Sequence, residues 1–150
     1  MPTIEESIHI VRKPQEVFDY IVETTNLPIW DVSVVKADRV DDGPLGLGSR
    51  TSGASKVLGK TFEWTTELTE FEPPFRATYT SVEGRLRFSV TNVLEADAEG
   101  TKFSIRFDAE SGLGGIFGRL TDPLIASAQA RTVRANLQTL AELLVAEPIT

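Results

Sequence analysis

The chain has 150 residues, no cysteine, one histidine and a formal net charge of −7. Its length suits one domain of about 100–200 residues, and a domain of this size holds together without disulfides or metals. The lack of cysteine excludes disulfides, thiolate zinc sites and cysteine nucleophiles. The negative charge opposes binding to phosphate backbones. We therefore predict a single domain over residues 1–150, with no metal, no cofactor and no nucleic-acid partner.

The sequence also predicts a protein without a membrane anchor. The first residues, MPTIEESIHI, lack the basic region and apolar run of a secretory signal. No apolar run approaches the roughly 18 residues that a spanning helix needs. Together with the absence of cysteine, these features predict a cytoplasmic protein. They leave a monomer and a homodimer equally open.

The first third of the chain predicts a strand, two short helices and a second strand. Residues 4–11 alternate, with isoleucine at 4, 8 and 10, which is typical of a half-buried strand. Pro14 suits a first helical turn, and Val17, Phe18 and Ile21 then mark one helical face. Pro28 begins a second short helix through Trp30. Residues 32–40 predict a strand, and DDGPLGLG at 41–48 predicts a turn.

The rest of the chain predicts a β-meander followed by one long helix. Apolar and polar residues alternate within four segments, at 60–71, 75–82, 85–94 and 101–109. Such alternation favours antiparallel strands with one covered and one solvated face. A further segment at 49–58 is weakly apolar on both faces, which suggests an edge strand or a cavity rim. Asp122 and Pro123 suit the start of a helix, and Val133, Leu137, Leu140 and Leu144 form one stripe along it. The predicted class is α+β, a curved seven-stranded antiparallel sheet around a long C-terminal helix.

Four stretches resemble a known family: PQEVFDYIVETTNLPIW, GPLGLGSR, the Gly100–Thr101 pair, and GLGGIFGRLTDPL with the later LQTLAELL. They are similar to the polyketide cyclase/dehydrase-like branch of the START and pollen-allergen-type helix-grip (SRPBCC) superfamily, over essentially the whole chain. The resemblance implies a deep cavity between sheet and helix. Members bind sterols, lipids, hormones, flavonoids or polyketides, and some are aromatases or cyclases. It also implies that the glycine-rich segment at 112–118 lies near the cavity entrance, where it would gate access.

The composition of the long helix favours such a cavity. Its first half carries alanines, including Ala126, Ala128 and Ala130, and its second half carries leucines. Small residues opposite large aromatic ones leave room for a flat apolar ligand. Alternatively, the alanines merely let helix and sheet approach closely. The aromatic wall is predicted from Phe62, Trp64, Phe88, Phe103 and Phe107.

Polar residues on these apolar faces are candidates for orienting a ligand. Tyr79 and Asn92 can bond a ligand carbonyl or phenol, or else a neighbouring group or water. Trp30 lies at the mouth of the cavity or, alternatively, fastens the short helices to the sheet. The remaining predicted ligand-binding residues are Thr66, Ala128, Gln129 and Thr132.

We predict that the protein binds a small hydrophobic molecule that is aromatic, polyketide-like or lipid-like. The alternative is an aromatase/cyclase or dehydratase, with Tyr79 and the rim residue Glu70 as proton-transfer candidates. The inward strand faces carry no arginine or histidine, which weighs against this enzyme. His9 is expected on the exposed convex face, and a partner-binding role of that outer face has no particular residues in its favour.

Overall fold

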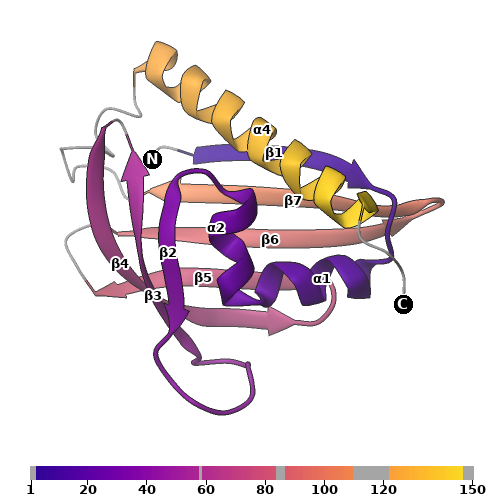
Figure 1. Ribbon diagram of the computed structural model, residues 1–150, viewed down its shortest axis with the longest axis horizontal. Coiled ribbons are helices and arrows are strands. Elements are labelled where there is room, and N and C mark those ends of the chain that lie inside the picture. The colour runs from indigo at the N-terminus through magenta and orange to yellow at the C-terminus, as the bar shows by residue number, and fades with distance from the viewer. Residues whose placement is uncertain (1–2, 58, 84–86, 110–121, 147–150) are drawn as a thin grey trace.

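The computed structural model describes residues 3–57, 59–83, 87–109 and 122–146 (Figure 1). The glycine-rich segment at 112–118, with its predicted gating role, lies outside these residues. The elements are β1 (Thr3–Ile10), α1 (Pro14–Val22), a 3-10 turn η1 (Thr24–Asn26), α2 (Leu27–Trp30), β2 (Val34–Arg39), β3 (Arg50–Val57), β4 (Lys60–Glu72), β5 (Arg76–Glu83), β6 (Phe88–Asp97), β7 (Gly100–Ala109) and α4 (Pro123–Ala146).

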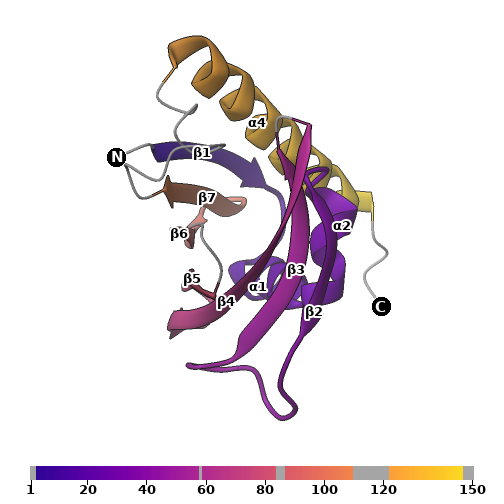
Figure 2. The ribbon, with the colours of Figure 1, turned by 90° about the vertical axis from the view of Figure 1, so that its left-hand side faces the viewer.

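The seven strands form one antiparallel sheet in the order β1-β7-β6-β5-β4-β3-β2. The sheet curls strongly, and α4 lies across its open side, with α1 and α2 closing the other end (Figure 2). The last strand of the chain, β7, lies beside the first, β1, so that Ile8 pairs with Phe103 and Ile10 with Thr101. The predicted α+β class, seven-stranded sheet and long C-terminal helix are confirmed.

The two short helices carry the first part of the chain across the sheet. Pro14 occupies the first turn of α1, where its missing N–H leaves no bond unmade. Val17, Phe18 and Ile21 are buried on one face of this helix. Phe18 packs on Phe71 of β4 with ring centroids 5.7 Å apart. The predicted apolar face of α1 therefore seals one end of the core.

The long helix α4 has two different halves. Asp122 caps its start by accepting a hydrogen bond from the Leu124 N–H at 2.9 Å. Leu137, Leu140 and Leu144 are all buried in the main core, as the apolar stripe predicts. The first half of the helix carries no buried leucine and borders a cavity instead. The dry core thus occupies the C-terminal end of α4, and the cavity its N-terminal half.

Candidate functional site

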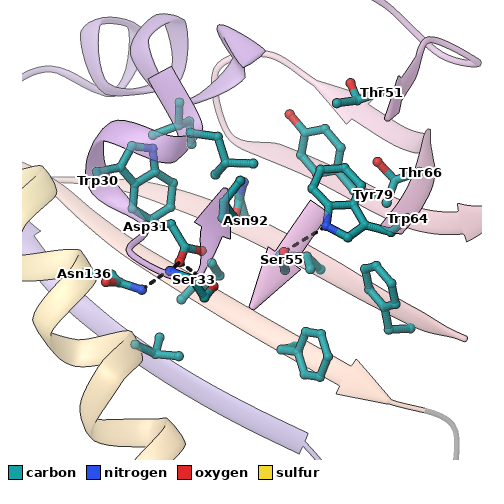
Figure 3. Close-up of a pocket in the computed structure, with 18 of the residues that line it drawn as sticks. Trp30, Asp31, Ser33, Thr51, Ser55, Trp64, Thr66, Tyr79, Asn92 and Asn136 are labelled. Atoms are coloured by element: carbon teal, nitrogen blue, oxygen red, sulfur yellow. Dashed lines mark hydrogen bonds between the residues drawn. The ribbon is translucent and has the colours of Figure 1, made fainter. Parts of the chain in front are cut away.

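A cavity of about 230 Å³ lies between the concave sheet face, the α1–α2 segment and the first half of α4 (Figure 3). Its walls are mainly apolar. Strands contribute Ile4, Val34, Phe62, Trp64, Tyr79, Phe88, Val90, Ile105 and Phe107, and helices contribute Ile21, Val22, Leu27, Trp30 and Val133. Its polar lining residues are Thr24, Asp31, Ser33, Thr51, Ser55, Thr66, Asn92, Gln129, Thr132 and Asn136.

The predicted ligand-binding residues gather around this cavity with two exceptions. The lining includes Trp30, Phe62, Trp64, Thr66, Tyr79, Phe88, Asn92, Phe107, Gln129 and Thr132. Strand alternation was sufficient to place the sheet residues, because each strand has one face toward the cavity. Contact between these residues and a ligand stays a prediction.

Phe103 does not line the cavity. It is fully buried in the main core and meets Trp30 edge-on, with ring centroids 6.4 Å apart. It lies on the expected strand face but too far along β7, opposite Leu94 and Ile8. At that level the leucine half of α4 fills the space between helix and sheet. Alternation predicts the face of a residue, and its position along the strand decides between core and cavity.

The predicted alanine floor is also wrong. Ala128 is only half-buried and is not among the lining residues. The helix presents Gln129, Thr132, Val133 and Asn136 to the cavity instead, a spacing of i, i+3, i+4 and i+7 along one helical face. The cavity floor is therefore largely polar rather than made of small apolar residues.

Glu70 lies on the outer face of the sheet, not at the cavity rim. Leu68 pairs with Tyr79, but Glu70 pairs with Thr78, so a bulge in β4 inserts one extra residue. The bulge turns Glu70 outward. There it accepts hydrogen bonds from Thr78 Oγ1 at 2.7 Å and Arg76 Nε at 3.3 Å. Its carboxyl has no access to the cavity as a proton-transfer group.

The aromatic wall is held by specific contacts. Phe88 and Phe107 stack with centroids 5.7 Å apart and an interplanar angle of 25°. Trp64 donates its indole N–H to Ser55 Oγ at 2.8 Å, which fixes the ring against β3. The ring covers Gly53, where only a residue without a side chain leaves space for it. These contacts build a rigid, flat apolar surface along one side of the cavity.

Two polar atoms in the cavity wall are buried without a hydrogen-bond partner among the described residues. They are Nε1 of Trp30 and Oδ1 of Asn92. Trp30 is only 3% exposed, so it both fastens α2 to the core and lines the cavity. Buried polar groups are nearly always paired in folded proteins. Each of the two atoms has less than 1 Å² of accessible surface, so neither is presented to the cavity in this arrangement.

Tyr79 faces the cavity as a protonated phenol. Burial raises the pKa of Tyr79 to about 12. Desolvation disfavours the charged phenolate, so the hydroxyl keeps its proton at neutral pH. Tyr79 can then donate a hydrogen bond to a ligand, but it is a poor general base.

Asp31 is one of several polar lining residues that the sequence analysis did not predict. Its Oδ1 accepts three hydrogen bonds, from Ser33 N at 3.0 Å, Ser33 Oγ at 2.7 Å and Asn136 Nδ2 at 3.0 Å. Burial raises the pKa of Asp31, and these three bonds oppose that rise. The Asp-x-Ser spacing after α2 predicts the local turn, but the bond to Asn136 joins residues far apart in sequence.

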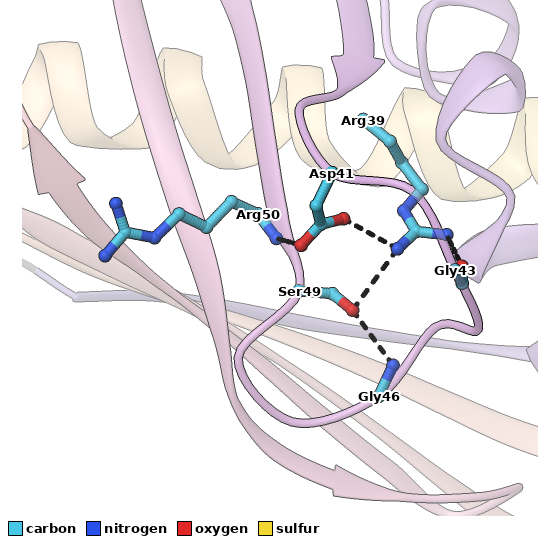
Figure 4. Close-up of polar contacts among 6 residues, drawn as sticks. All are labelled: Arg39, Asp41, Gly43, Gly46, Ser49 and Arg50. Atoms are coloured by element: carbon cyan, nitrogen blue, oxygen red, sulfur yellow. Dashed lines mark hydrogen bonds and ion pairs between the residues drawn. The ribbon is translucent and has the colours of Figure 1, made fainter.

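A second polar cluster lies in the β2–β3 loop, outside the cavity lining (Figure 4). Arg39 donates to Gly43 O at 2.8 Å and to Asp41 Oδ1 at 2.7 Å. The backbone N–H of Arg50 reaches the other Asp41 oxygen at 3.2 Å. The Arg50 backbone bond, followed by the Arg39 bond, lowers the pKa of the Asp41 carboxyl. This cluster closes the long loop and has a structural role.

The described residues offer little to other kinds of site. They contain no group of three or more histidine, cysteine, aspartate or glutamate side chains arranged to hold a metal ion. His9 is exposed on the outer face, as predicted, and pairs with Asp97 at 2.7 Å. None of the helices in the described part of the chain has both the length and the apolarity that a membrane crossing requires.

Comparison with known proteins agrees with this architecture. Residues 1–145 match the family described as polyketide cyclase / dehydrase and lipid transport, and the chain belongs to that family. Membership implies a fold that binds hydrophobic ligands. Uncharacterized proteins from two strains of Mycobacterium tuberculosis are each 26% identical over 141 residues, covering 92% of this chain and 92% of the relative.

Solved structures share the fold at low sequence identity. TTHA0849 from Thermus thermophilus has a TM-score of 0.78 at 23% identity, covering 97% of this chain and 98% of that one. The Zhui aromatase/cyclase from a Streptomyces species has a TM-score of 0.74 at 15% identity, covering 95% and 92% of the two chains. Ara h 8.0201 has a TM-score of 0.67 at 16% identity, covering 97% and 98%.

Proposed function

We propose that this protein binds a compact hydrophobic molecule in the cavity between the sheet and α4. The observation that carries the proposal is a cavity with mainly apolar walls and a small set of polar lining side chains, among them Asp31, Tyr79 and Asn92. The apolar walls supply affinity by removing ligand surface from water, at about 25 cal/mol per Å². The polar side chains supply orientation, because each forms a hydrogen bond only when a ligand group lies at one position.

The energetics of the cavity support an occupant. A rigid empty cavity costs about 24 cal/mol per Å³, so about 230 Å³ corresponds to about 5–6 kcal/mol. The net stability of a typical domain is only about 5–15 kcal/mol. Water or a ligand that fills the space recovers much of this cost, so the cavity is not expected to stay dry.

The size of the cavity favours a compact ligand. Ligand pockets usually measure roughly 300–1,000 Å³, and this one, at about 230 Å³, is small. A molecule with one or two rings fits such a space better than a long acyl chain. The stacked Phe88–Phe107 pair and the Trp64 indole favour a flat aromatic or polyketide-like ring system.

Sequestration accounts for the cavity better than the alternative aromatase/cyclase or dehydratase chemistry with the predicted residues. Glu70 lies outside the cavity lining, and Tyr79 holds its proton too tightly to act as a base. A poly-keto substrate would need groups that move protons at defined carbons. Glu70 does not reach the cavity and Tyr79 offers only a proton donor, so the two candidates do not form an acid–base pair there.

The first test is mass spectrometry of freshly purified protein, native against denatured, with an organic extract analysed in parallel. A bound mass that dissociates on denaturation supports the proposal and identifies the ligand class. The second test is the double variant Tyr79→Phe with Asn92→Leu, compared with Thr91→Val on the outer face beside Asn92. Altered ligand choice in the double variant alone supports the cavity as the site. Identical ligand binding in all three proteins would contradict it.

A further inference from the structure

We infer that Asp31 is the polar anchor of the cavity, and that it selects ligands presenting a hydrogen-bond donor, a hydroxyl or an ammonium, over ligands presenting a carboxylate. This inference rests on the proposed function and specifies the ligand class. It starts from the position of Asp31 in the cavity wall, directly after Trp30.

The first step is the hydrogen bonding of the carboxyl group. All three donors, from Ser33 and Asn136, reach the same oxygen, Oδ1. The other oxygen, Oδ2, receives no hydrogen bond from the described residues. Because Ser33 and Asn136 hold the carboxyl from two elements, its direction is fixed before a ligand binds (Figure 3). A preorganised acceptor of this kind favours a ligand that brings a donor.

The second step concerns charge. Among the described lining residues there is no lysine, arginine or histidine. A carboxylate partly removed from water therefore has no cation beside it, and such unpaired charge is costly. An ammonium or hydroxyl donor from the ligand relieves this cost. A second carboxylate, brought by a fatty acid or aromatic acid, would add to it by like-charge repulsion.

The third step concerns the rest of the polar lining. Gln129, Thr132 and Asn136 of α4 border the same cavity as Asp31. Amide and hydroxyl side chains can both donate and accept hydrogen bonds, so these residues discriminate little between ligand groups. Asp31 is the one acidic residue among the described lining residues, and discrimination against a carboxylate rests with it.

The test measures the affinity of matched probes by calorimetry: naphthalene, naphthol, naphthylmethylamine and naphthoate, the last three substituted at the same ring position. The proteins are the wild type, Asp31→Asn and Asp38→Asn, which removes the same charge from an exposed position outside the cavity lining. Asp31→Asn keeps the oxygen that Ser33 and Asn136 contact, and it loses the ionisable one.

We expect the wild type to bind naphthol or the amine at least about tenfold more tightly than naphthoate, the scale of one hydrogen bond to a charged group. Asp31→Asn should reduce this ratio by about tenfold, and Asp38→Asn should leave it unchanged. If Asp31→Asn weakens the binding of the amine more than that of naphthol, the ligand group that Asp31 binds is an ammonium. If it weakens the binding of naphthol more, that group is a neutral hydroxyl. Both patterns support the inference.

Two results would overturn the assignment of Asp31 as the polar anchor while leaving the proposed function intact. In the first, naphthalene binds but the ratio is the same in wild type and Asp31→Asn. In the second, the wild type itself prefers naphthoate over naphthol, a result that holds even when the variant fails to fold. Failure of every probe, naphthalene included, to bind the wild type would overturn both the anchor and the proposal of a compact hydrophobic ligand.

Discussion

The substitution Gly53→Ala tests how the aromatic wall of the cavity is built. Gly53 lies in β3 opposite Trp64 of β4. A methyl group added there would lie 2.6 Å from Trp64 Cζ2 and 2.7 Å from Cη2, and closer still to the backbone oxygen of Lys36. Real Cβ atoms essentially never approach other heavy atoms within 3.0 Å. The strand or the indole must therefore move.

The size of the effect follows from three contributions. Overpacking costs about 1–3 kcal/mol, and displacing Trp64 weakens its bond to Ser55, worth about 0.5–1.5 kcal/mol. Opposing these, replacing glycine by alanine reduces the freedom of the unfolded chain and stabilises by about 0.4–1 kcal/mol. We expect a net destabilisation of about 1–3 kcal/mol. Without the clash, the sign would be the opposite.

The assay is urea unfolding followed by tryptophan fluorescence. The matched control is Gly46→Ala, because a Cβ at Gly46 meets nothing within 4 Å and its φ is not positive. A double variant with Trp64→Leu measures the coupling between Gly53 and the indole. If Gly53→Ala were as stable as Gly46→Ala, or if the coupling were zero, the account of the wall would be refuted.

Three further outcomes are expected from the same unfolding assay. Leu140→Ala, at a fully buried position, should destabilise by about 2–5 kcal/mol, and an effect below about 1 kcal/mol would place it outside the core. Thr101→Val removes a 2.7 Å hydrogen bond to the Arg12 carbonyl and should lower the free energy of unfolding by about 1–3 kcal/mol. An unchanged free energy of unfolding would show that another group bonds this carbonyl in the variant. The raised pKa of Asp31 means that its folded form prefers the proton, so its stabilising contribution is present below the ordinary pKa of 3.8 and is lost as pH rises through the folded value. Asp31→Asn should therefore gain stability relative to wild type as the pH rises above 3.8, and a difference that stays constant with pH would contradict the assigned burial.

The fold was predictable because it depends on local patterns. Alternation in the strands and the i, i+4, i+7 stripe on α4 are written in neighbouring residues, and they define which faces meet. Asp122 and Pro123 mark the start of α4 in the same local way. The sheet and the helix that it grips follow once these faces are buried together. No distant contact has to be known for this inference.

Glu70 marks the limit of such reasoning. A strict period of two places it on the same face as Leu68, and the bulge between them reverses that relation. On the outer face, Glu70 accepts hydrogen bonds from Thr78 and Arg76 of β5. Nothing in the local alternation around Glu70 records this pairing.

Asp31 eluded prediction for a related reason. Its short-range partner, Ser33, is visible in the sequence, and its long-range partner, Asn136, is not. The contact requires α4 to cross the sheet in one register, so that Asn136 Nδ2 lies 3.0 Å from Asp31 Oδ1 and Asn136 Oδ1 lies 3.3 Å from the Val32 N–H. A carboxyl group in a loop is recognisable as part of a cavity only after the elements around it are assembled.

The polar residues of α4 explain why one half of this helix packs in the core and the other half borders the cavity. Leucines at positions 137, 140 and 144 lose nothing by complete burial, so the sheet closes on them. Gln129, Thr132 and Asn136 face the same interior one and two turns earlier. Asn136 is buried with hydrogen-bond partners in Asp31 and Val32, whereas Gln129 and Thr132 border the open space of the cavity. One helix therefore both stabilises the fold and holds open the space in which a ligand with matching polar groups would bind.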